Sequence, residues 1–164
     1  MQHGTVVPAL RHYRRYEAAL AKASRARNQR RVAAIHAKIA NARRHHLHEQ
    51  STRIARENRL IAVGNVNAIK LVKTPMAKSV LDASWSTFRN QLRYKAGRHG
   101  ARYVETDERN TSATCSACGC VGGPKGIAGL RMRSWVCCNC GVGHDRDLNA
   151  AVNILRRAGT SASC

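Results

Sequence analysis

Two cysteine pairs constrain this chain more than any other feature of its sequence. The pairs have C-x-x-C spacing and are separated by 18 residues: Cys115 with Cys118, and Cys137 with Cys140. This spacing is typical of a four-cysteine zinc site, in which each pair turns two thiolates toward one tetrahedral ion. Gly119 and Gly141 follow the pairs, where such turns often need a positive φ. We therefore predict a four-cysteine zinc ribbon over residues 111–143, built of turns and short strands.

The alternative for these cysteines is a set of disulfides, which suits secreted proteins. The N-terminal segment MQHGTVVPAL has no long apolar run and no targeting signal, so we favour zinc and expect a cytoplasmic, prokaryotic protein. Two roles are open for Cys120 and Cys138, which adjoin the predicted ligands. Each is either a competing ligand or a reactive neighbour. Cys164, in the polar C-terminal tail, is expected to be a bystander.

The charge of the chain points to a polyanionic partner. Its 29 basic and 9 acidic residues give a formal net charge of +20 over 164 residues. Arginine supplies 22 of the basic residues and lysine only 7, which favours bidentate contacts with phosphate. Nucleic acid is the usual partner of such a protein. A membrane is the rival partner, but no stretch has the length of a spanning helix, so we expect no membrane association.

Residues 1–58 are predicted to form a basic helical arm. From Ala9 to Leu60 the chain contains no proline or glycine and carries 14 basic and 3 acidic residues. A break near 24–29 would give two antiparallel helices. Their apolar stripes at helical spacing consist of Tyr13, Tyr16 and Leu20, and of Val32, Ile35, Ile39 and Ala42. The arginines expected to bind nucleic acid are Arg14, Arg15, Arg30, Arg31, Arg43 and Arg44. We interpret His45, His46 and His48 as surface residues in preference to metal ligands.

Residues 59–110 and 144–158 are predicted to form an α/β core, so the fold class is α+β. An apolar strand over 59–64 precedes a helix that Thr74 caps, and a second strand follows over 101–105. The strand–helix–strand order predicts that the two strands are parallel. The helix between them carries an apolar stripe and ends at Gly97 and Gly100; the stripe consists of Leu81, Trp85, Phe88 and Leu92.

The last predicted helix begins at Asp145 or Asp147 and ends before Gly159. Its inner face is expected to consist of Leu148, Val152 and Leu155. Residues 159–164 are predicted to be a disordered tail.

Four segments together resemble the C-terminal region of the TnpB/OrfB family of transposon-encoded proteins, over residues 8–158. The segments are KTPMAKSVLDASWSTFRNQLRYKA, DERNTSATCSACG, SWVCCNCG and HDRDLNAAVNIL. The family is commonly described as transposases, is related to type V CRISPR effectors, and acts as RNA-guided DNA endonucleases. The resemblance implies a RuvC-like, RNase H-type core interrupted by a zinc ribbon. It also implies DNA and a guide RNA as partners.

The family's nuclease uses three carboxylates around two Mg²⁺ ions, and the resemblance assigns the last of these to Asp147. The first, an aspartate on the first strand, has no counterpart in this sequence. Where many members have a glutamate after the fourth strand, this chain has Gly64 and Asn65. We expect Glu108 to take that role, because it follows a parallel neighbouring strand at the same edge of the sheet. The alternative is that Glu108 is an ordinary loop carboxylate.

These observations lead to one main reading and two rivals. The main reading is an N-terminally truncated TnpB-like protein that binds nucleic acid, with an ancestral Mg²⁺-dependent DNA endonuclease activity in transposition. The chain alone is not expected to cleave DNA, and the missing N-terminal portion or another copy would be a partner. The first rival is a catalytically inactive DNA- or RNA-binding protein, acting as a regulator or surviving as a transposon relic. The second is a zinc-ribbon module that binds protein.

Overall fold

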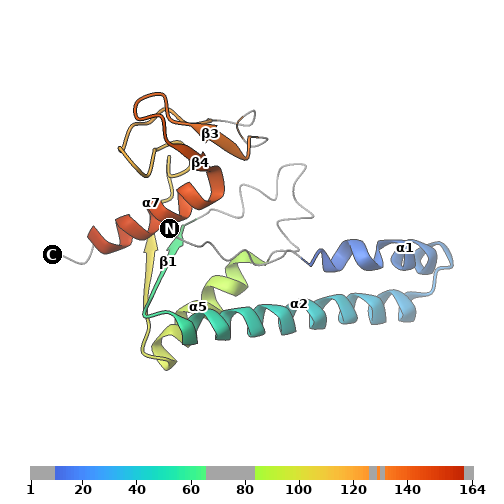
Figure 1. Cartoon of the computed structure of the whole chain (residues 1–164). Helices are drawn as coiled ribbons and strands as arrows, with labels where there is room; N and C mark the ends of the chain where they lie inside the picture. Colours follow the sequence, from blue (N-terminus) through green and yellow to red (C-terminus); the bar gives the residue numbers. More distant parts are fainter. Residues whose placement is uncertain (1–9, 66–83, 126–128, 130–131, 161–164) are drawn as a thin grey trace. The chain divides into compact units, whose positions relative to one another are not determined.

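The computed structural model describes residues 10–65, 84–125, 129 and 132–160 (Figure 1). These residues form two compact units. The first, here called the helical unit, contains the described residues within 10–59 and 84–102, and the second, the ribbon unit, contains those within 60–65 and 103–160. No helix among the described residues combines the length and the apolar character needed to cross a membrane.

The helical unit begins with an antiparallel hairpin of α1 (His12–Arg25) and α2 (Gln29–Glu57), as predicted (Figure 1). The turn between them contains Arg27 at φ 50°, and the Asn28 side chain accepts a hydrogen bond from the Arg31 N–H to cap α2. The two predicted stripes meet in one cluster of buried and half-buried side chains: Tyr13, Tyr16, Leu20, Ala23, Val32, Ile35 and Ile39. Burial of these apolar groups holds the hairpin together despite its high charge.

The third helix of this unit, α5 (Trp85–Arg98), packs along α2. Leu92 and Ala96 are buried, whereas Trp85 at the start of the helix is 43% exposed. The predicted Thr74 cap and Leu81 lie outside the described residues. The helix ends between Gly97 and Gly100, as predicted: α5 extends to Arg98, and the positive φ of 70° occurs at Gly100. A glycine in the last turn costs a helix little, because that turn frays in any case.

In the ribbon unit, β1 (Leu60–Gly64) pairs with β2 (Arg102–Thr106). The Arg102 N–H donates to the Arg59 carbonyl at the start of the pair, and the Asn65 N–H donates to the Thr106 carbonyl at its end. The two strands therefore advance together, so the predicted parallel pairing is confirmed. The carboxyl ends of both strands lie at one edge, where Asp107 and Glu108 follow β2.

Between β2 and the last helix, two short strands form an antiparallel hairpin, β3 (Ser134–Val136) and β4 (Gly143–Asp145). Trp135 lies opposite His144 in this register, and their ring centroids are 4.9 Å apart. Among the described residues of the ribbon, Trp135 is the large buried side chain. A Cβ atom at Gly123 would lie 2.9 Å from the Trp135 ring, so the close approach of the loop requires a glycine there.

The final helix, α7 (Arg146–Thr160), corrects two sequence-based expectations. It includes Gly159 and Thr160, which had been assigned to the tail; residues 161–164 lie outside the described part of the chain. Leu148 and Leu155, expected on its inner face, are 39% and 47% exposed. The buried positions are instead Asn149, Asn153 and Ala158. Hydrogen bonding by the two asparagines, described below, explains why polar residues occupy this face.

Candidate metal centre and nucleic-acid interface

The four cysteines of the two C-x-x-C pairs converge on one point, as their spacing predicts. The sulfur atoms of Cys115, Cys118, Cys137 and Cys140 all lie within 4.8 Å of one another. Sulfur–sulfur distances across the two pairs are 3.7 Å, for Cys115 with Cys140 and for Cys118 with Cys137. Four thiolates about 2.3 Å from a tetrahedral Zn²⁺ would be separated by about 3.8 Å. The cluster therefore has the size and donor set of a structural zinc site.

Two turns with the same backbone pattern position these sulfurs. In the first, the Gly119 N–H donates to the Cys115 carbonyl and the Cys115 N–H donates to the Cys120 carbonyl. The second turn repeats both bonds with Gly141, Cys137 and Val142. Gly119 and Gly141 have φ of 80° and 70°, which confirms that the turns need glycine after each pair.

The repeated pattern also locates the two extra cysteines. Cys120 occupies the place that Val142 has in the second turn, and Cys138 occupies the place that Ser116 has in the first. Neither belongs to the sulfur cluster. Cys120 instead packs against the buried pair Cys115 and Cys137 beside Trp135. The geometry favours a neighbour role for both.

The surroundings of the four sulfurs shift the pKa values of Cys118 and Cys140 in opposite directions. The Asn139 side-chain amide lies 3.5 Å from the Cys118 sulfur, and this contact, with a backbone N–H, lowers the Cys118 pKa to about 6. His144 Nε2 lies 3.0 Å from the Cys115 sulfur. At Cys140 the Val142 N–H acts to lower the pKa, but desolvation and the neighbouring sulfurs together raise the pKa to about 12. Four thiolates so close together need a cation to neutralise them.

Sequence reasoning missed the two asparagines that join the first turn to α7. The Asn149 side-chain N–H groups donate to the carbonyls of Thr111 and Thr114, and its oxygen accepts from the Ser116 N–H. Asn153 donates to the same two carbonyls at 2.9 and 2.7 Å. The signal was available in the sequence, since two asparagines stand four residues apart within DLNAAVN and therefore share one helix face.

We expect Asn149→Ala to destabilise the ribbon by about 2–3 kcal/mol, because it leaves the half-buried Ser116 N–H without its acceptor and removes two donors. Chemical denaturation of the metal-loaded chain, followed at the Trp135 indole NMR signal, measures this loss. Asn90→Ala, at an exposed position of α5, is the control and should change stability by less than about 0.5 kcal/mol. An equally small change in stability for Asn149→Ala would contradict the proposal that the Asn149 hydrogen bonds stabilise the ribbon.

The predicted nucleic-acid-binding arginines lie on α1 and α2. All are exposed except Arg43, which is half-buried; the set is Arg14, Arg15, Arg30, Arg31, Arg43 and Arg44. Arg15, Arg31 and Arg44 are among those that make short-range contacts within the hairpin. Arg15 lies over the Tyr16 ring, the Arg31 N–H is the capping contact with Asn28, and Arg44 donates to Asn41 at 2.6 Å. His45, His46 and His48 form no metal-binding group within the described residues, where the four cysteines are the only such set.

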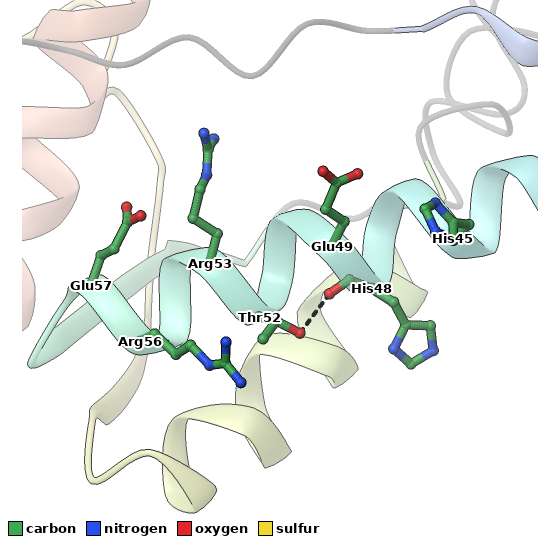
Figure 2. Close-up of a pocket in the computed structure, with 7 residues that line it drawn as sticks. All are labelled: His45, His48, Glu49, Thr52, Arg53, Arg56 and Glu57. Carbon is green, nitrogen blue, oxygen red and sulfur yellow. Dashed lines mark hydrogen bonds between the residues drawn. The ribbon is translucent and has the colours of Figure 1, made fainter.

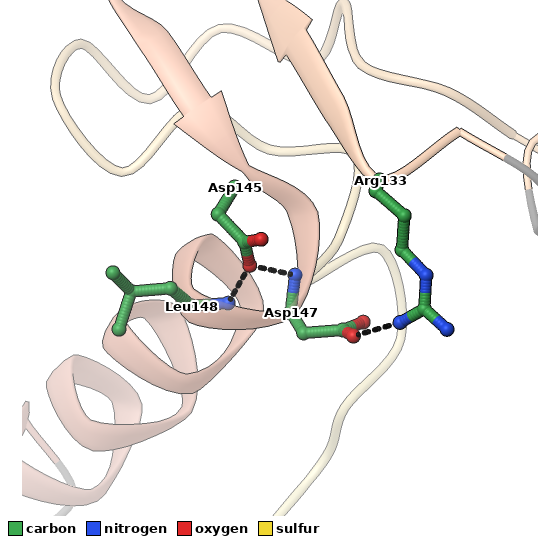
Figure 3. A network of polar contacts seen from close by, with 4 residues as sticks. All are labelled: Arg133, Asp145, Asp147 and Leu148. Atoms are coloured by element: carbon green, nitrogen blue, oxygen red, sulfur yellow. Dashed lines mark hydrogen bonds and ion pairs between the residues drawn. The ribbon is translucent and has the colours of Figure 1, made fainter. Parts of the chain in front are cut away.

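The two aspartates at the start of α7 have different roles (Figure 3). Asp145 Oδ1 accepts hydrogen bonds from the N–H groups of Asp147 and Leu148, at 3.0 and 2.9 Å, so Asp145 is the helix cap. Asp147 is therefore not needed to start the helix. Its carboxylate pairs with Arg133 at 2.8 Å, and both side chains are largely exposed.

Glu108 lies against Gly64, at the edge where β1 and β2 end. A Cβ atom built at Gly64 would be 3.0 Å from the Glu108 Cβ and 2.6 Å from its Oε2. The Glu108 side chain thus fills the space that a side chain at position 64 would enter. Asn65 also contacts it, because its Oδ1 accepts a long hydrogen bond from the Glu108 N–H at 3.4 Å. On the other side, Ile154 of α7 would be 3.3 Å from the same Cβ.

Comparison with known proteins identifies the family. Residues 85–154 match the family described as "Cas12f1-like, TNB domain". A provisionally named RNA-guided DNA endonuclease from Streptomyces pristinaespiralis is 36% identical over 94% of this chain, and one from Mycobacterium tuberculosis is 31% identical over 74%. The chain belongs to the TnpB/OrfB family. InsQ of Escherichia coli, also provisionally named an RNA-guided DNA endonuclease, is 23% identical over 84% of the chain.

The fold is also similar to a known one. The Cas12f1 chain in a cryo-EM structure of a Cas12f1–sgRNA–target DNA complex matches 85% of this chain with a TM-score of 0.66 and 17% identity. At that identity the likeness concerns the fold alone. The chain spans 41% of the Streptomyces relative, 27% of the Mycobacterium relative and 40% of the Cas12f1 chain.

Proposed function

We propose that this TnpB-family chain binds nucleic acid as part of an RNA-guided DNA endonuclease that acts in transposition. The observation that carries the proposal is the α1–α2 hairpin, whose segment from Ala9 to Leu60 has 14 basic and 3 acidic residues. The apolar side chains of the hairpin pack against one another in its core, and most of the arginines are exposed to solvent. The names of the relatives and the sgRNA–DNA complex of the Cas12f1 neighbour support DNA and guide RNA as the partners.

As part of this function, we propose that the four-cysteine cluster holds a structural Zn²⁺. All four positions of a tetrahedron are filled by sulfur, which leaves no open site for substrate and is the pattern of structural zinc. The ion would cross-link two turns that are far apart in the sequence and share a core of little more than Trp135. Zinc would therefore supply stability to the ribbon and no chemistry.

We propose that β1, β2 and α7 belong to an RNase H-type core, and that Glu108 and Asp147 are two of its carboxylates. The contact of Glu108 with Gly64 supports the replacement of a glutamate at position 64. Asp147 stands seven residues, or two helical turns, before Ile154, so it lies on the helix face that packs over Gly64. Asp145 takes the capping role, so Asp147 is not needed to cap the helix.

The described residues supply only part of a magnesium site. Neither Glu108 nor Asp147 belongs to a group of three potential metal ligands within them, and the Asp147 carboxylate is paired with Arg133. In the intact family nuclease, Mg²⁺ would activate water and stabilise the leaving oxygen. Glu108 and Asp147 would contribute negative charge to that site, and Arg133 would have to release Asp147.

We expect tight binding of the purified chain to duplex DNA at low salt, with weak sequence preference and a steep loss of affinity as salt rises. Each phosphate contact contributes about −0.9 to the slope of log Kobs against log salt concentration. Replacing Arg30 and Arg31 with glutamine should reduce the slope by about one to two contacts. Fluorescence anisotropy with a labelled duplex, repeated over a range of salt concentrations, measures both quantities.

The matched control replaces Arg109 and Lys125 with glutamine, which removes the same charge from exposed positions of the ribbon unit. It should leave the slope nearly unchanged. A flat salt titration of the wild-type chain, or equal effects of the two double variants, would be evidence against the hairpin as the binding surface.

A further inference from the structure

A small pocket between α2 and α5 is lined mostly by cationic side chains. Its volume is about 320 Å³, and its lining residues are Thr52, Arg56, Lys95, Arg98 and His99. Thr52 and Arg56 come from α2, whereas the other three come from the end of α5 and the residue after it. All belong to the helical unit. Two helices that bring three full positive charges and a histidine to one pocket must offset their mutual repulsion by other interactions.

Lys95 is the fixed charge at the base of this pocket. It is only 7% exposed, and its Nζ donates to the His48 carbonyl and to the hydroxyls of Ser51 and Thr52, at 2.7, 2.8 and 2.7 Å. These three bonds use all the ammonium hydrogens and fix its position. None of the three acceptors carries a charge, and burial lowers the Lys95 pKa. An anion nearby would stabilise the charged form of Lys95.

The carboxylates nearest in sequence point away from this pocket. Figure 2 shows Arg56 and Thr52 on the side of α2 that faces α5, whereas Glu49 and Glu57 project elsewhere. Both glutamates line an adjoining, larger depression of about 680 Å³ along α2, which shares Thr52 and Arg56 with the cationic pocket. In the described part of the chain, no carboxylate lines the cationic pocket, and Arg56 and Arg98 form no ion pair. Among the described residues, the lining of the cationic pocket therefore contains no counter-ion.

We infer that this pocket, between the C-terminal ends of α2 and α5, binds one phosphodiester group of a nucleic-acid backbone. Arg56 and Arg98 would donate to the phosphate oxygens from opposite helices, and Lys95 would add its fixed charge from below. The inference rests on the proposed nucleic-acid binding and extends it. It assigns a defined phosphate position to the α2–α5 interface, in addition to the arginines of the hairpin.

The test replaces Arg56 and Arg98 with glutamine in the full chain. The control is Arg53→Gln with Arg102→Gln, which removes the same charge from exposed positions outside the pocket. Binding of a labelled duplex of about 30 base pairs is measured over a series of salt concentrations. We expect the pocket variant to weaken binding about tenfold or more and to reduce the salt slope by about 0.9, as the loss of one ordered phosphate contact requires. The control should weaken binding by less than about threefold.

A second arm separates a backbone phosphate from a free one. Inorganic phosphate is titrated into the wild-type chain while the His99 imidazole signals are followed by NMR. We expect shifts only at millimolar phosphate, which the pocket variant abolishes, and displacement of phosphate by the duplex. If phosphate binds but the pocket variant holds DNA normally, the pocket is a small-anion site and the inference is wrong.

Two further outcomes distinguish this inference from the proposed function. Equal losses for the pocket and control variants would overturn the pocket alone, because binding would then depend on total charge. A wild-type chain that binds no duplex at any salt concentration would contradict both the pocket and the proposed function.

Discussion

Replacing Cys115 or Cys140 with serine is expected to abolish zinc binding and to unfold the ribbon of residues 111–143. Metal binding and folding are coupled in such small sites, and zinc-finger peptides gain about 10–16 kcal/mol of apparent binding energy from the ion. The ribbon has little hydrophobic core to replace the stabilisation by zinc, since Trp135 is its one large buried side chain among the described residues. Elemental analysis of the purified variants gives the metal content, and dispersion of the ribbon NMR signals reports folding.

Cys120→Ser and Cys138→Ser are the matched controls. Each removes a sulfur atom that lies next to the cluster in the sequence but does not belong to it. Both variants should retain one zinc ion per chain and a folded ribbon. The equivalence of Cys138 with Ser116 in the other turn makes serine a natural residue at that place. Loss of zinc from the Cys138 variant, with retention in the Cys140 variant, would overturn the assignment of the ligands.

Removing Glu108 or Asp147 is expected to eliminate Mg²⁺-dependent DNA cleavage by a longer, active protein that contains this sequence. Loss of a charged group that stabilises the transition state costs on the order of 10³-fold in rate or more. DNA binding by Glu108→Ala should remain within about threefold of wild type, because the change removes negative charge near the DNA. Single-turnover cleavage and binding assays on the same preparations separate the two effects. Normal cleavage by Glu108→Ala would leave Glu108 as an ordinary loop carboxylate.

A swap tests whether Glu108 replaces a glutamate at position 64. Gly64→Glu alone should not add activity and should lower stability, because its Cβ would lie 3.0 Å from the Glu108 Cβ. Combined with Glu108→Gly, the same change removes the clash and returns the carboxylate to the end of β1. We expect the double variant to recover part of the cleavage that Glu108→Gly loses. Asn90→Ala, away from this edge, should leave cleavage unchanged. Failure of the swap in a folded double variant would be evidence against the replacement.

Locally encoded features of this protein were predictable from the sequence. The C-x-x-C turns depend on residues within six positions of one another and on glycines at Gly119 and Gly141, so spacing was sufficient to predict them. The hairpin of α1 and α2 followed from apolar residues at helical spacing and from the break at 24–29. Parallel pairing of β1 with β2 followed from the strand–helix–strand order. The turns and the hairpin depend on residues close along the chain, and the strand pairing depends on the order of the elements.

Polar side-chain contacts between distant segments were decided only by the tertiary structure. Hydrophobicity suggested that Leu148 and Leu155 face inward on α7, but the carbonyls of the first cysteine turn select Asn149 and Asn153 instead. Burial of Lys95 likewise depends on acceptors more than forty residues away in α2. The spacing of apolar residues predicts which face of a helix is apolar. It does not predict where a backbone carbonyl or hydroxyl of a distant segment will need a hydrogen-bond donor, because that position exists only in the folded chain. Polar contacts at long range therefore determined which helix faces are buried, and the sequence by itself determined which helices form.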